Sequence, residues 1–114
     1  MDSDLYAAIP ENDVRKDQFY GAYSDLMPLG KFYDDDRQPY GASQSVSADY
    51  IYMRIAEMYL LNAESAAKTG DESTAKNSLK ALLYERLPDV TYVDGLSGQA
   101  LLDEIYLQTR IELW

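Results

Sequence analysis

The side chains that most often carry out chemistry in proteins are either missing from this sequence or present without a pattern. The chain has no Cys and no His, which excludes a thiol nucleophile, an imidazole base, a Ser-His-Asp triad and a zinc finger. It has 20 Asp and Glu residues, and two carboxylates could serve as the acid and base of a glycosidase. No such pair is marked by its surroundings, so we expect no enzymatic activity and assign no catalytic residue.

Three consecutive acids, Asp34, Asp35 and Asp36, offer carboxylate oxygens of the kind that Ca²⁺ prefers. Calcium loops place their acids at alternating positions and include a glycine, and neither feature is present in this run. We therefore interpret it as a solvated turn and expect no metal and no cofactor.

Length and charge limit the classes of protein to which this chain can belong. The 114 residues allow one compact domain, and 46% apolar residues are enough for a core. The formal net charge of -10 argues against a nucleic-acid partner, because phosphates require a basic face. The longest apolar run, Met58 to Ala63 with Asn62 inside it, is far too short to span a membrane.

Composition divides the chain near residue 49. Residues 1–48 contain three of the four prolines and scattered aromatic residues, which predict loops and short extended pieces that pack on the rest. In residues 49–114 apolar residues recur three and four positions apart, which is typical of helices. We predict helices at about 49–69, at about 72–87, and from a cap at Ser97 to the end.

The link between the first two helices is short and well marked. Gly70 is suited to a left-handed C-cap and Asp71 to the N-cap of the second helix, so the two helices must pack antiparallel. Ala63 and Ala75 lie where the helices would cross closely, with the spacing of a tetratricopeptide unit. The predicted fold is mainly α: a tetratricopeptide-like helical hairpin plus a third helix, preceded by a loop-rich N-terminal segment.

Each predicted helix has an apolar side. In the first helix Ile55, Tyr52 and Tyr59 fall on the side that also holds the alanines, and we expect both tyrosines in the core. The second helix should bury Ala75, Leu79, Leu82 and Leu83. The third is apolar on two sides, one with Leu101, Leu102, Ile105 and Leu113 and the other with Leu107, Ile111 and Trp114. A helix of this kind needs neighbours on two sides, so we expect a longer protein or a partner.

Three segments in order along the chain carry a family resemblance. They read Lys-Phe-Tyr-Asp at 31–34, Asp-Tyr-Ile-Tyr-Met-Arg-Ile-Ala-Glu-Met-Tyr-Leu-Leu-Asn-Ala-Glu at 49–64, and Gln-Thr-Arg-Ile-Glu-Leu-Trp at 108–114. Together they resemble the SusD/RagB family, in its C-terminal, tetratricopeptide-like part. The chain departs from the family pattern after the second helix, where Lys80, Leu83 and Glu85 replace an Asn and two Arg that we expect to bridge helices. Gln108 and Thr109 replace a Glu-Arg pair in the same way.

The resemblance implies a function that composition alone does not supply. Members of the family are surface-exposed lipoproteins of the outer membrane that bind oligosaccharides, or in some cases peptides. They pass these nutrients to a TonB-dependent transporter without catalysis. The chain would then be part of a longer protein, whose lipid anchor and signal lie outside this sequence. The alternative is a standalone tetratricopeptide-like adaptor that binds a peptide or protein partner.

No ligand-binding residue is assigned from the sequence. Aromatic residues in loop-like sequence could stack on sugar rings; they are Tyr20, Tyr23, Phe32, Tyr33 and Tyr40. Four charged residues at family-like positions could contact a transporter; they are Arg54, Glu57, Arg110 and Glu112. We favour instead an interhelical set of ion pairs and hydrogen bonds for these four, which fixes helix packing.

Overall fold

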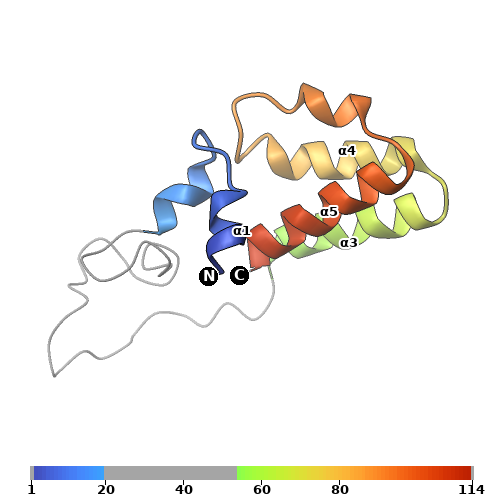
Figure 1. The fold of residues 1–114 in the computed structure, drawn as a ribbon. Helices are drawn as coiled ribbons and strands as arrows, with labels where there is room; N and C mark the ends of the chain where they lie inside the picture. Colours follow the sequence, from blue (N-terminus) through green and yellow to red (C-terminus); the bar gives the residue numbers. More distant parts are fainter. Residues whose placement is uncertain (1, 20–53, 114) are drawn as a thin grey trace, which may run out of the picture. The chain divides into compact units, whose positions relative to one another are not determined.

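The structure, a computed structural model, describes residues 2–19 and 54–113. The chain divides into two compact units, Met1–Tyr52 and Met53–Trp114, described separately below. The first contains α1 (Ser3–Ala7) and the 3₁₀ helix η1 (Val14–Gln18); the second contains α3 (Ile55–Lys68), α4 (Glu72–Leu83), the 3₁₀ helix η2 (Thr91–Gly95) and α5 (Gly98–Leu113) (Figure 1). The described residues confirm the mainly α prediction, whereas the predicted packing of residues 1–48 on the helices stays a prediction.

Residues 2–19 form two short helices, each started by an aspartate. Asp2 Oδ1 accepts hydrogen bonds from the N–H groups of Asp4 at 2.8 Å and Leu5 at 3.2 Å, which caps α1. Asp13 caps η1 by accepting from the N–H of Arg15 at 2.8 Å, and its carboxylate also pairs with the buried Arg15 guanidinium. The prediction of loops and short extended pieces was wrong here, because these caps favour helical turns.

The α3–α4 hairpin has the predicted link. Gly70 has a φ of 86°, a left-handed conformation that favours glycine, directly after the end of α3. Asp71 then caps α4, its carboxylate accepting from the N–H of Thr74 at 3.0 Å. Ala63 and Ala75 are fully buried, as expected where small residues let two helices approach closely.

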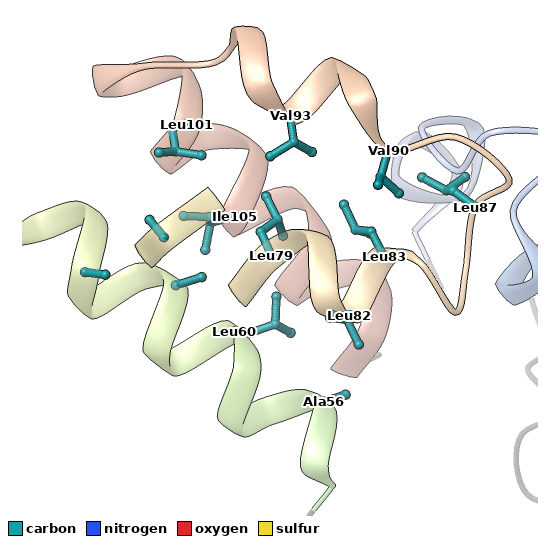
Figure 2. Close-up of a cluster of buried hydrophobic side chains, with 13 residues drawn as sticks. Ala56, Leu60, Leu79, Leu82, Leu83, Leu87, Val90, Val93, Leu101 and Ile105 are labelled. Atoms are coloured by element: carbon teal, nitrogen blue, oxygen red, sulfur yellow. The ribbon is translucent and has the colours of Figure 1, made fainter. Parts of the chain in front are cut away.

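One apolar cluster joins the three helices with the segment between α4 and α5, as Figure 2 shows. Leu60 of α3, Leu79 of α4 and Ile105 of α5 lie near its centre. Val90 and Val93, from the segment around η2, are buried in the same cluster beside α4. All four predicted core residues of α4 are buried, namely Ala75, Leu79, Leu82 and Leu83.

Helix α5 packs mainly against α3 and runs antiparallel to it. Leu101 and Ile105 on its inner side are buried, as predicted. Ile111 of the second predicted apolar side is buried too, whereas Leu113 is 41% exposed. Trp114 lies outside the described residues.

Two parts of the helix prediction were wrong. Helix α4 ends at Leu83 rather than at 87. The chain tightens instead, with Arg86 N–H donating to Leu83 O at 2.9 Å. Ile55 is 74% exposed and Tyr59 41% exposed, so the apolar side predicted for α3 is only partly covered within the described residues.

Candidate functional site

A hollow of about 290 Å³ lies between α3 and α5, and polar groups and one aromatic ring line it. We call it the α3–α5 groove; its lining residues are Glu64, Lys68, Gln99, Leu102, Asp103, Ile105, Tyr106 and Thr109. The two helices lie side by side in Figure 1, with the end of α3 beside the beginning of α5. Its floor is apolar at Leu102 and Ile105, and most of the other lining residues are polar.

Each side of the α3–α5 groove carries a hydrogen-bonded pair of polar side chains. On α3 the Lys68 ammonium donates to the Glu64 carboxylate one turn before it. On α5 the Gln99 side-chain amide donates to Asp103 Oδ1 at 2.7 Å, also across one turn. Because a carboxylate accepts with two oxygens and an amide carries both donors and an acceptor, these pairs keep hydrogen-bonding capacity toward the groove.

Tyr106 forms an aromatic rim beside these pairs. Its side chain is 66% exposed, and the Arg110 guanidinium lies 5.8 Å from the centre of its ring. The contact is a cation–π interaction across one helical turn, and it helps to fix the orientation of the ring. An exposed, oriented ring beside paired polar groups can bind a ligand that has both an apolar and a hydroxyl-bearing face.

A second hollow, of about 320 Å³, lies in residues 2–19 and is lined by Tyr6, Glu11, Lys16, Asp17 and Phe19. Its two aromatic rings already contact other side chains of the same segment. Phe19 meets Tyr6 edge to face with 5.6 Å between ring centres, and Lys16 Nζ lies 5.0 Å from the Tyr6 ring centre. Lys16 also donates to Ile9 O at 3.2 Å and pairs with Glu11. These contacts favour a structural role for this hollow.

A partly buried ion pair at the other end of α5 fixes that helix. Arg86 binds the Glu112 carboxylate through two hydrogen bonds, from Nε to Oε2 at 3.1 Å and from Nη2 to Oε1 at 3.0 Å. Arg54, just before α3, donates from Nη1 to the backbone oxygen of Glu112 at 3.1 Å. The last turn of α5 is thereby tied both to the start of α3 and to the segment after α4.

For part of the set of four charged residues, these contacts agree with the prediction that they fix helix packing. Arg54 and Glu112 join in an interhelical set as expected, whereas Arg110 contacts Tyr106. The sequence did not reveal that Arg86 supplies the bridging charge, because its partner Glu112 lies 26 residues further along the chain. The loss of bridging charge expected from Lys80, Leu83 and Glu85 is therefore compensated.

Further polar contacts hold the beginning of α5 near α4. The Glu72 carboxylate accepts from the Gly98 N–H at 2.7 Å. Lys80 Nζ donates to Asp94 Oδ1 at 2.6 Å, and this hydrogen bond raises the pKa of Lys80 above its ordinary value. Both contacts join α4 to the segment that leads into the Gln99 side of the α3–α5 groove.

Several residues singled out in the sequence lie outside the described residues. They are Asp34, Asp35, Asp36 and the aromatic residues Tyr20, Tyr23, Phe32, Tyr33, Tyr40 and Tyr52. The prediction that Tyr59 is a core residue was wrong, because its side chain is substantially exposed. Within residues 2–19 and 54–113 no group of three or more acidic side chains is placed to hold a metal ion. Nor is any helix of those residues long and apolar enough to cross a membrane.

Comparison with known protein families identifies the class of this chain. A family model described as the SusD family matches residues 10–114. The chain therefore belongs to the SusD family, as the three ordered segments predicted. No curated protein and no solved structure matches the chain.

Proposed function

We propose that this chain is part of a non-catalytic glycan-binding protein of an outer-membrane nutrient uptake system. Membership of the SusD family implies a role of this kind at the level of the family. The single observation that carries the proposal is the family match over nearly the whole chain, residues 10–114.

The finer parts of the proposal concern partner and location. The protein would be a surface-exposed lipoprotein that passes an oligosaccharide to a TonB-dependent transporter. The composition is compatible with a binding role, since a chain without Cys or His lacks thiol nucleophiles and imidazole bases. It also has 11 Tyr, a residue that offers an apolar ring and a hydroxyl to a sugar.

The experiment that tests this function uses the organism that encodes the chain. Disrupting the gene should abolish or slow growth on one glycan and leave growth on simple sugars unchanged. An antibody raised against the chain should label intact cells. Unchanged growth on every glycan, or labelling only after lysis, would contradict the proposal.

The same cells separate the proposal from the standalone adaptor. Cross-linking on intact cells should recover the protein together with a large outer-membrane transporter. Recovery with a cytoplasmic protein and no outer-membrane component would favour an adaptor that uses the α3–α4 hairpin.

A further inference from the structure

The α3–α5 groove combines an exposed ring with balanced charge. Of the charged residues that line it, Glu64 and Asp103 are negative and Lys68 is positive; the Arg110 guanidinium, beside the Tyr106 ring at the rim, supplies a second positive charge. The whole chain, in contrast, has a formal net charge of -10. The neutrality of this one region therefore differs from the molecule around it.

A ligand that fits this region must itself be close to neutral. A strongly charged ligand would have to displace Glu64 from Lys68, or face Asp103, at a cost in free energy. A purely apolar ligand would desolvate the pairs Glu64–Lys68 and Gln99–Asp103 and offer them no hydrogen bonds in return. A sugar avoids both costs, because it presents hydroxyl groups around its edge and a C–H face to an aromatic ring.

The positions of the polar groups suit such a ligand. Gln99 and Asp103 precede Tyr106 by two turns and one turn on the same side of α5, so a ligand on the ring can reach both. Their mutual hydrogen bond of 2.7 Å fixes both side chains before a ligand arrives, which lowers the entropic cost of binding. Thr109 donates its hydroxyl to Ile105 O at 2.8 Å, and the oxygen keeps its acceptor capacity.

We propose that the α3–α5 groove is a subsite for a neutral oligosaccharide. Tyr106 stacks against one sugar ring, and Gln99 and Asp103 hydrogen-bond to its hydroxyls. The inference rests on the proposed function for the class of ligand, and on the groove's own chemistry for its place and its preference for neutral sugars.

The test is a titration of the isotope-labelled 114-residue chain followed by nuclear magnetic resonance. The probes are neutral oligosaccharides of glucose, mannose and xylose and, for comparison, an acidic oligomer of galacturonate, each raised to millimolar concentration. At least one neutral probe should shift the side-chain amide signals of Gln99 and the backbone signals of Tyr106 and Thr109. The acidic oligomer should bind more weakly.

Substitutions on the groove have a matched control. Tyr106→Ala should weaken binding about fivefold, since a stacking contact contributes on the order of 1 kcal/mol. Tyr84→Ala removes a second tyrosine of the same 66% exposure that lines no part of the groove, and it should leave binding unchanged. Gln99→Ala, at an exposed helix position, should weaken binding about threefold through lost hydrogen bonds.

Four results would contradict the proposed subsite. Shifts confined to other residues would place the glycan elsewhere and leave the proposed function standing. Equal weakening by Tyr106→Ala and Tyr84→Ala would refute the stacking of a sugar on Tyr106. Tighter binding of the acidic oligomer would refute the preference for neutral sugars. An absence of shifts with every probe would reject the subsite, while growth and surface labelling of cells decide the proposed function independently.

Discussion

The two sides of α5 differ in burial and in the kinds of side chain that they present. The inner side buries Leu101, Ile105 and the Glu112 carboxylate against the other helices. The outer side exposes Tyr106 and the Gln99–Asp103 pair beside the α3–α5 groove. Within α5, stability therefore depends mainly on the inner side, whereas the outer side is exposed. Substitutions on the two sides should have separable effects.

The largest effect is expected on the inner side. Leu101 is fully buried in the apolar cluster, so Leu101→Ala should lower the free energy of unfolding by about 3 kcal/mol through lost burial and a residual cavity. Leu113→Ala, on the same helix but at a partly exposed position, should cost less than about 1 kcal/mol. Urea denaturation followed by circular dichroism measures both. Equal costs would show that the inner side is not the stabilising one.

The second effect concerns the ion pair that holds the end of α5. Arg86→Ala should lower the free energy of unfolding by about 2 kcal/mol, because it leaves the buried Glu112 carboxylate without its main partner. Arg86→Lys keeps the charge but loses the two-point contact, so its cost should be intermediate. If the two variants are equally stable, the paired hydrogen bonds are not what matters.

A smaller effect appears on acidification. Hydrogen bonds from the side chain and the backbone N–H of Thr74 hold the pKa of Asp71 below its ordinary value. A depressed carboxyl pKa contributes stability above the pKa of the unfolded chain, and this is lost as pH falls through the folded-state pKa. Asp71→Asn should therefore flatten the acid limb of a melting-temperature profile. An unchanged acid limb would mean that this cap does not contribute.

The smallest effects are expected at the exposed residues that line the α3–α5 groove. Lys68→Ala removes an exposed ion pair across one helical turn and should change the free energy of unfolding by less than about 0.5 kcal/mol. Tyr106→Ala should be similarly neutral for stability, since its side chain is largely exposed. Parallel urea titrations of both variants check this. A cost of Tyr106→Ala above that of Leu113→Ala would mean that the two sides of α5 are not independent.

The sequence predicted the hairpin well because its signals are local. Gly70 and Asp71 define a helix end and a helix start without reference to the rest of the chain. The apolar spacing of α4 identified its buried side, since neighbours cover every apolar position on that side. In α3 the same reasoning failed at Ile55 and Tyr59, because periodicity shows which residues are apolar and not which ones a neighbour covers.

The candidate site could not be predicted in the same way. Lys68 of α3 and Gln99 of α5 both line the α3–α5 groove, although α4 separates their helices in the sequence. The groove therefore forms only when the helices pack. Arg86 was missed for a related reason, since its partner Glu112 lies 26 residues away and nothing local marks the pair. The family resemblance supplied the function, and only the folded chain supplied the groove.

The measurement that tests the central claim most directly is a calorimetric titration of the 114-residue chain with a panel of neutral oligosaccharides. The sugars are recovered afterwards and analysed by chromatography. We predict saturable binding of at least one glycan, which is recovered at its original length because the protein binds and does not cleave. No binding across the panel would contradict glycan binding by this part of the protein, and recovery of shortened sugars would contradict its non-catalytic role.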